Sequence, residues 1–455
     1  MPRVIMEHAL VGADWRRNVD LEWDDAGCIV AVTPDSVASG IETIAGVSIP
    51  GIANLHSHTF QRAIAGVSES LGVGGDTFWT WRQAMYRAVE RLNPDNLHAV
   101  AALAFAEMLE GGFTAVAEFH YIHNAPDGRP YADRAVMAQA IVEAAAETNM
   151  GLTLLPVFYA HGGFGGKPLE TAQRRFGSDL DGFAKLVETS AAALKSLPGS
   201  ALGIAPHSLR AVAPAELKTL AHSFSGKPIH IHAAEQVREV EECVASLGRR
   251  PVEFLLDELP VGKEWCLVHS THLTPAETQR LAQSGAVAGL CPVTEANLGD
   301  GIFPAGAYLK AGGRLGVGTD SNIHIDAAEE LRQLEYSQRL HHKARNVLAE
   351  PGRSTGRRLF DAAVASAAPV LARQVGALQL GNRADFVVLD TGHLSMLGRA
   401  GDTWLDSWIF AAGKEAVREV WAGGRRVVNQ GRHIAAEAIR RRYAGIVNQL
   451  TDGNS

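Results

Sequence analysis

The sequence predicts an α/β protein, a (β/α)8 TIM-type barrel with a small β-sandwich domain built from both chain ends. Between about residues 49 and 370, short β-rich runs alternate with alanine-rich amphipathic stretches, which is typical of a parallel sheet covered by helices. Both chain ends instead contain short alternating runs with turn residues. A Gly-rich dinucleotide turn, which an open Rossmann sheet would require, is missing from the sequence.

The expected barrel occupies residues 49–375. Its helical segments include LHAVAALAFAEMLEGG and RAVMAQAIVEAAAETN, which separate successive strands. Eight strand candidates follow one another: IPGIANLHSH, FTAVAEFHY, GLTLLPVFYA, ALGIAPHSL, PIHIHAAE, WCLVHSTHL, GAVAGLCP and GRLGVGTDS. Eight strands joined by helices are the number that closes a parallel barrel.

The two terminal pieces, residues 1–48 and 376–436, are each too small to bury a core of their own. Examples of their alternating runs are VDLEWDDAGCIVAV, ADFVVLD and VREVWAGGRRVV. We therefore expect them to pair into one β-sandwich domain, with the barrel inserted between its halves. Residues 437–455 are predicted to form a C-terminal helix.

Composition limits the classes of partner. A formal net charge of −8 argues against a nucleic-acid or anionic membrane surface, because such surfaces need clustered Lys and Arg. The cysteines are scattered without C-x-x-C spacing, so neither a disulfide framework nor a thiolate zinc site is indicated; they are Cys28, Cys243, Cys266 and Cys291. The first residues lack an apolar segment with a cleavage site, and we expect a cytoplasmic protein.

Four candidate metal ligands end three of the strand-like runs. His56 and His58 stand in NLHSHTF, His232 in PIHIHAAE and Asp320 in LGVGTDS. Residues i and i+2 of a strand point to the same face, so the first two histidines can reach one ion. Three imidazoles and a carboxylate suit one divalent ion, with zinc expected, although iron and manganese share these ligands. A pair of half-buried imidazoles bound to carbonyls, or a turn aspartate, is the alternative.

Two further residues are placed to act on a water molecule. Glu235, three residues after His232 in HAAE, is the expected general acid and base, unless it is a helix first-turn glutamate. His269, in CLVHSTHL, is expected to orient the water and polarise the substrate, with a structural histidine as the alternative. Asp320 is expected to assist both as ligand and as acceptor from the water. The fourth strand, ending in APHSLR, offers no Lys or Glu to bridge two ions, which favours one ion.

The sequence resembles the deaminase branch of the amidohydrolase superfamily over nearly its whole length. The segments that carry the resemblance are PGIANLHSHTFQR, HAAE, GTDS, GNRADFVVLD and VREVWAGGRRVV. Within that branch it is most similar to enzymes that act on N-formimino-L-glutamate in bacterial histidine degradation. The resemblance implies metal-dependent hydrolysis of a linear amidine, giving N-formyl-L-glutamate and ammonia. It also implies a homodimer, because similar enzymes are often dimers.

The same resemblance implies five substrate contacts, in the segments HTFQRA, FWTWRQAMY, EFHYIHN and APHSLR: Gln61, Arg82, Tyr121, His207 and Arg210. A small-molecule substrate with two carboxylates suits the two arginines, since planar guanidinium groups bind carboxylates through paired hydrogen bonds.

Two other functions remain open at this stage. One is the deamination of a purine, pterin or other aromatic amidine, for which Tyr121 and Trp81 would stack on the ring. Two arginines in the pocket argue against it. The other is a non-catalytic relative that keeps the barrel for assembly, but such a protein has no need of an intact ligand set together with Glu235 and His269.

Overall fold

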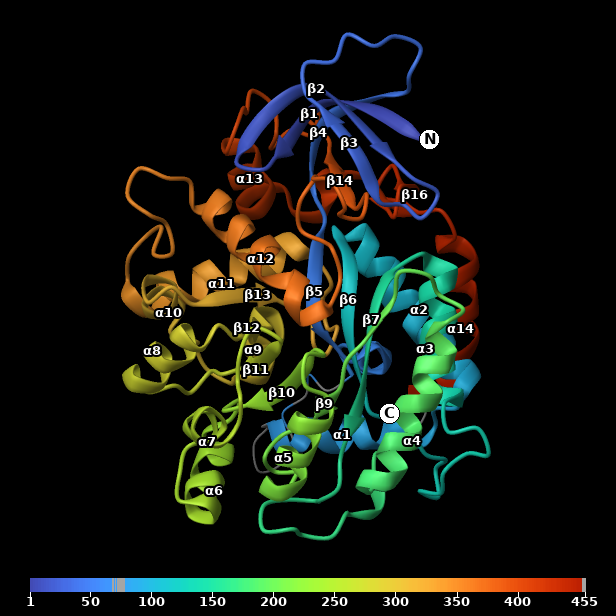
Figure 1. Cartoon of the computed structure of the whole chain (residues 1–455), viewed down its shortest axis with the longest axis vertical. Coiled ribbons are helices and arrows are strands. Elements are labelled where there is room, and N and C mark those ends of the chain that lie inside the picture. Colours follow the sequence, from blue (N-terminus) through green and yellow to red (C-terminus); the bar gives the residue numbers. More distant parts are fainter. Residues whose placement is uncertain (68, 70, 72–77, 452–455) are drawn as a thin grey trace.

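The computed structural model describes residues 1–455 except 68, 70, 72–77 and 452–455. Figure 1 shows parallel strands surrounded by helices, with a mixed sheet at one end that combines the first and the last segments of the chain. In the described part of the chain, no helix has both the length and the apolar character that crossing a membrane requires.

The parallel strands form a ring of eight positions, which confirms the predicted barrel fold. One sheet contains β5 to β8, with β9 paired to β7, and a second contains β10 to β13. Isolated bridges join the two sheets at both edges, Ser57 to Asp320 on one side and Ser208 to His232 on the other. The strands are β5 (Ile52–Ser57), β6 (Phe113–His120), β7 (Gly151–Phe158), β8 (Ala201–Leu202), β9 (Ala205–Pro206), β10 (Ile229–Ala233), β11 (Trp265–His269), β12 (Val287–Leu290) and β13 (Arg314–Val317). β8 and β9 together occupy the fourth position.

Capping residues mark where several of the covering helices begin. Asn93 caps α2, with Pro94 as its first residue, and Thr274 and Glu277 form a reciprocal capping box at the start of α8. The helices around the barrel are α1 (Phe78–Glu90), α2 (Pro94–Glu110), α3 (Val136–Thr148), α4 (Leu180–Leu194), α5 (Pro214–Ser223), α6 (Val237–Leu247), α7 (Pro251–Glu258), α8 (Pro275–Ser284), α9 (Pro292–Leu298), α10 (Ala305–Lys310), α11 (Ala327–His342) and α12 (Thr355–Leu371). The short segments η1 (Thr59–Ile64) and η2 (Thr171–Gln173) follow strand ends.

Both chain ends share one sheet, in the order β17-β16-β15-β14-β4-β1-β2-β3. Trp23 of β2 and Trp421 of β15 lie four strands apart in this order, yet their rings are 5.9 Å apart. The sheet therefore folds over its own apolar core, as a sandwich does. Its strands are β1 (Arg3–Val11), β2 (Asp14–Trp23), β3 (Ile29–Thr33), β4 (Thr43–Pro50), β14 (Phe386–Leu389), β15 (Val417–Ala422), β16 (Arg425–Asn429) and β17 (Arg432–His433). The domain limits at 48/49 and 375/376 remain a prediction.

The chain after β14 is helical on both sides of β15 to β17. The helices α13 (Thr403–Ser407), η3 (Trp408–Ala412) and η4 (Gly413–Ala416) precede β15, and α14 (Ala436–Thr451) is the last element. Arg442 of α14 forms ion pairs with Glu147 of α3, at 2.5 and 2.9 Å. This contact ties the C-terminal helix to the barrel. The last four residues of the predicted helix, 452–455, lie outside the described residues.

Candidate active site

Four side chains that are far apart in the sequence meet where the barrel strands end. His56 and His58 come from β5 and its end, His232 from β10, and Asp320 from the residues that follow β13. All four are buried, and one ligand atom from each lies within 4.8 Å of the others. Oδ1 of Asp320 is 3.2 Å from Nε2 of His56 and 3.3 Å from Nε2 of His58. Nε2 of His232 is 3.1 Å from Nε2 of His56.

Hydrogen bonds to the backbone decide which imidazole nitrogen faces this cluster. The Nδ1–H of His58 donates to the carbonyl of Phe119 at 2.9 Å, and that of His232 donates to the carbonyl of His207 at 3.0 Å. Each Nε2 therefore presents a lone pair. Lone pairs that face one another and a carboxylate repel, unless a cation lies among them. The carbonyl-bound histidines expected as the alternative are present, but as the second contact of His58 and His232.

Burial keeps these imidazoles neutral, as metal ligation requires. Desolvation lowers the pKa of His58 to about 3, with the neighbouring His56 adding to the shift. The pKa values of His56 and His232 also lie well below the ordinary value, again mainly because of burial. Together with the convergent lone pairs, this makes the group fit a divalent metal ion.

The backbone around the cluster is held in conformations that L-residues rarely adopt. Asp320, Ala234 and His269 have φ angles of 44°, 53° and 66°. Such residues cost about 1–3 kcal/mol each, and they persist where the surroundings fix them. Asp320 is fixed on both sides, since its N–H donates to the carbonyl of His56 and its own carbonyl accepts from the N–H of His58, both at 2.9 Å. These backbone conformations direct the side chains at the strand ends toward the site.

Glu235 and His269 lie next to this group of four candidate metal ligands. Nε2 of His269 is 3.7 Å from a carboxylate oxygen of Glu235, and Nη2 of Arg210 is 3.6 Å from the other oxygen. Burial raises the pKa of Glu235 to about 7, although His269 and Arg210 oppose the shift. Burial opposes the charged form of His269, but the carboxylates of Glu235, Glu295 and Asp320 outweigh it and raise its pKa to about 10. A carboxyl group with a pKa of about 7 suits proton transfer near neutral pH.

Glu235 is not a first-turn helix residue, because α6 begins only at Val237. The turn that carries it is held by the buried carboxylate of Glu239. This carboxylate accepts from the backbone N–H of Ala234 at 3.2 Å and from that of Glu235 at 3.0 Å. The glutamate is thereby held at the cavity, beside His269.

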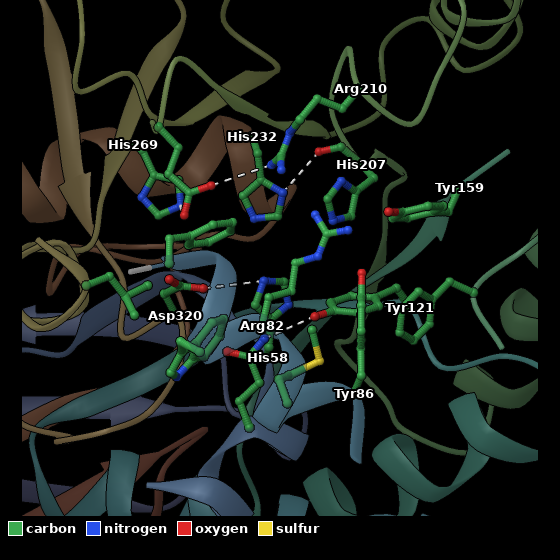
Figure 2. A pocket seen from close by; sticks show the side chains of 17 residues that line it. His58, Arg82, Tyr86, Tyr121, Tyr159, His207, Arg210, His232, His269 and Asp320 are labelled. Carbon is green, nitrogen blue, oxygen red and sulfur yellow. Dashed lines mark hydrogen bonds and ion pairs between the residues drawn. The ribbon is translucent and has the colours of Figure 1, made fainter. Parts of the chain in front are cut away.

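The five substrate contacts implied by the resemblance line the same cavity as Glu235, His269 and Asp320: Gln61, Arg82, Tyr121, His207 and Arg210. The empty space of the cavity, counted together with the solvent at its mouth, is about 540 Å³. Figure 2 shows Arg82 and Arg210 among the side chains that line it, together with His58 and His232. The structure brings these residues together, and their roles as contacts stay a prediction.

Sequence reasoning missed several residues of the cavity wall. Tyr159 directly follows β7, so the rule that found the histidines, a polar side chain at a strand end, could have found it too. Tyr86 lies on α1 and Phe176 on a loop, and both line the cavity without any sequence signal of their own. Glu295 of α9, which lies 3.2 Å from Nδ1 of His269, was also missed.

Comparison with known proteins decides the family. The sequence model of the amidohydrolase family matches residues 47–427. The chain belongs to the amidohydrolase family. This amidohydrolase is 46% identical to the formimidoylglutamate deiminase of Pseudomonas aeruginosa over 454 residues, which cover 99% of this chain and 100% of that protein.

Solved structures agree with this assignment. The crystal structure of an amidohydrolase from Brucella melitensis superposes with a TM-score of 0.94 at 46% identity, covering 99% of this chain and 100% of that one. An adenosine deaminase from Xanthomonas campestris, solved with bound zinc, has a TM-score of 0.79 at 23% identity and covers 98% of both chains. At that identity the second comparison shows only a shared fold, which confirms the barrel with its sandwich domain.

Proposed function

We propose that this amidohydrolase hydrolyses N-formimino-L-glutamate to N-formyl-L-glutamate and ammonia, a step of histidine degradation. The observation that carries the proposal is that one cavity joins the His/Asp cluster and Glu235 to Arg82 and Arg210. A hydrolytic centre and two guanidinium groups match a linear amidine that bears two carboxylates. The 46% identity to a formimidoylglutamate deiminase over the whole chain supports the same substrate.

We infer that His56, His58, His232 and Asp320 hold one divalent ion, with zinc favoured by the ligand set. The zinc of the related adenosine deaminase structure supports this choice. When bound, such an ion lowers the pKa of a water molecule toward about 7 and polarises the group under attack.

The chain's own residues carry the protons. The carboxylate of Glu235 takes a proton from the attacking water as its oxygen bonds to the formimino carbon, and Asp320 accepts a hydrogen bond from the same water. Glu235 then delivers this proton to the terminal nitrogen, and it passes the second proton of the water, from the hydroxyl group of the adduct, to the same nitrogen. The bond between that nitrogen and carbon breaks, ammonia leaves, and a formyl group remains. His269, charged and 3.7 Å from Glu235, stabilises the negative charge that develops at the attacked amidine.

The remaining contacts place the substrate. Arg82 and Arg210 bind its two carboxylates, while Gln61, Tyr121 and His207 complete the wall around the amidine. Tyr121 and Gln61 already form a pair, with the Gln61 amide nitrogen 3.0 Å from the phenol oxygen. The hydrogen bonds of the site are thereby arranged before a ligand enters, which reduces the entropic cost of binding.

Ammonia release from N-formimino-L-glutamate, with the metal content measured on the same sample, tests the proposal. We expect rapid turnover with about one ion per chain. Guanine and adenosine serve as comparison substrates, because the aromatic wall of Tyr86, Tyr159 and Phe176 is the feature that favours an aromatic amidine. Turnover of either purine with none of N-formimino-L-glutamate would reject the proposal in favour of the aromatic alternative.

We further infer a homodimer that works in the cytoplasm on a small molecule, without nucleic acid or membrane partners. The net charge of −8 supports the absence of polyanionic partners. Light scattering coupled to size exclusion tests the dimer, for which the expected mass is twice that of the chain. The mass of a single chain at micromolar concentration would contradict it.

A further inference from the structure

Two tyrosines outside the expected set of contacts face the cavity from different elements. Tyr86 lies on α1, and Tyr159 directly follows β7. The fully buried side chain of Gln173, on η2, joins them. Its amide nitrogen is 3.1 Å from the hydroxyl oxygen of Tyr159 and 3.4 Å from that of Tyr86.

The orientation of the Gln173 amide is fixed by the backbone. The N–H of Glu170 can only donate, and it lies 2.9 Å from Oε1 of Gln173. The NH2 group must therefore face the tyrosines, and its two hydrogens match the two hydroxyl oxygens. Because each hydroxyl oxygen accepts from this amide, each O–H hydrogen is left to be donated to another acceptor.

The loop that carries Gln173 is itself held in place. Arg175, 1% exposed, donates through Nη1 to the carbonyl of Val89 on α1 and through Nε to the carbonyl of Asn124, the latter at 3.0 Å. These bonds connect the loop to the helix that carries Tyr86. The distance between the two hydroxyl groups is therefore set before any ligand binds.

Two guanidinium groups, of Arg82 and Arg210, lie near both hydroxyls, together with the carboxylate of Glu170. The guanidinium carbon of Arg82 lies 5.2 Å from the centre of the Tyr86 ring, and Figure 2 shows this group reaching toward Tyr159 and His207. Burial raises the pKa of Tyr86 and of Tyr159, and Arg82 and Arg210 offset only part of the shift. Both phenols therefore stay neutral and keep their hydrogens at physiological pH. Two O–H donors that line the cavity beside a guanidinium group suit the binding of a carboxylate.

We propose that Tyr86 and Tyr159, with their hydroxyl groups oriented by Gln173, bind one carboxylate of the substrate. The two tyrosine hydroxyls add hydrogen bonds to the charge-assisted contact that Arg82 makes with this carboxylate. Gln173 is a positioning residue that does not touch the substrate. This subsite rests on the proposed function for the identity of its ligand, a carboxylate on a linear amidine. It explains why a cavity with an aromatic wall accepts an aliphatic dicarboxylate.

Titration calorimetry of the metal-loaded protein with N-formyl-L-glutamate tests the tyrosines without relying on turnover. Tyr159→Phe and Tyr86→Phe are each expected to weaken binding by about tenfold or more, since a hydrogen bond to a charged group is lost. The matched control is Tyr308→Phe, which removes a buried hydroxyl that bonds to the Arg314 carbonyl away from the cavity. Binding by Tyr159→Phe within twofold of the unaltered protein would overturn the subsite.

Two substitutions of Gln173 distinguish a role in orienting the tyrosine hydroxyls from a role in packing alone. Gln173→Met removes the donors, whereas Gln173→Glu keeps the acceptor for the Glu170 N–H but draws the tyrosine hydrogens toward itself. We expect Gln173→Glu to bind N-formyl-L-glutamate more weakly than Gln173→Met, because it reverses the donor direction and adds a negative charge. Equal or tighter binding by Gln173→Glu would contradict the orienting role.

Kinetics distinguish a failure of the subsite from a failure of the proposed function. With N-formimino-L-glutamate, the tyrosine and Gln173 variants are expected to raise KM with little change in kcat, whereas N-propylformamidine, which has no carboxylate, should be hydrolysed by all forms at equal rates. If the unaltered protein binds N-formyl-L-glutamate but does not hydrolyse N-formimino-L-glutamate, the proposed function fails and the subsite stands. If it does not bind N-formyl-L-glutamate, the subsite is refuted.

Discussion

Nε2 of His269 lies 3.7 Å from a carboxylate oxygen of Glu235 because the strands that precede these residues are neighbours in register. Ala233, the last residue of β10, pairs with His269, the last residue of β11. Two residues later the chain reaches Glu235, after a turn in which Ala234 adopts a φ of 53°. The acid–base pair therefore depends on the alignment of two adjacent strands and on one strained turn.

Replacing Glu235 with Gln is expected to leave the metal bound and to reduce kcat by about a hundredfold or more, because the amide cannot transfer the proton. The measurements are ammonia release and metal content by mass spectrometry. Glu241→Gln, an exposed change on α6, is the matched control and should retain activity. Near-normal turnover by Glu235→Gln would refute its role.

Removal of the metal should abolish activity and lower the thermal midpoint, because a bound ion stabilises only the folded state. Dialysis against a chelator followed by zinc should restore both. Asp320→Asn is expected to bind metal at least about tenfold more weakly, since a neutral amide replaces the only carboxylate of the cluster. Full metal content after extensive chelation of this variant would show that the ion is held elsewhere.

The fold and the cluster were predictable because strand periodicity and strand ends are local properties of the sequence. His56 and His58 sit on one face of a strand by their spacing alone, and the closure of the ring then brings His232 and Asp320 to them. The terminal sandwich was predictable for a similar reason, as neither chain end can bury a core by itself. The barrel was confirmed, although β8 and β9 divide its fourth strand.

The rest of the cavity depends on tertiary contacts that leave no local pattern. Tyr86 lies on an amphipathic helix where any large residue would fit the period, and Gln173 becomes informative only when its amide is seen between two hydroxyl groups. No pattern in the sequence marks Glu295 either, because its contact with His269 joins a helix to a strand end. The roles of such residues become visible only in the folded structure.

Arg82→Lys is expected to raise KM for N-formimino-L-glutamate by about tenfold or more with a smaller change in kcat, because an ammonium group cannot form the paired hydrogen bonds of a guanidinium. Steady-state kinetics measure both parameters. Arg87→Lys, an exposed change on the same helix, is the control and should leave KM unaltered. An unchanged KM in Arg82→Lys would show that this residue does not contact the substrate.

Stability should decrease as the pH falls below about 6.5, because two buried histidines that are not candidate metal ligands resist protonation in the folded protein. Burial lowers the pKa of His123 and of His230 to about 4, against which their hydrogen bonds to the carbonyls of Val157 and Val370 work only in part. Below its unfolded pKa each histidine binds a proton in the unfolded chain but not in the folded one. Stability is therefore fully present above about 6.5 and lost progressively toward 4. From pH 7 to 5.5 each contributes a loss of about 1.2 kcal/mol.

Urea unfolding at pH 7 and pH 5.5 measures this loss of stability, and the His123→Gln variant isolates the contribution of one histidine. The variant is expected to be less stable at neutral pH, yet to lose about 1.2 kcal/mol less than the unaltered protein on acidification, because it removes one proton from the difference between the states. His222→Gln, at an exposed position on α5, should leave the acid loss unchanged. An identical acid loss in His123→Gln and the unaltered protein would mean that His123 is protonated in the folded state as readily as in the unfolded one, which would contradict the effect assigned to its burial.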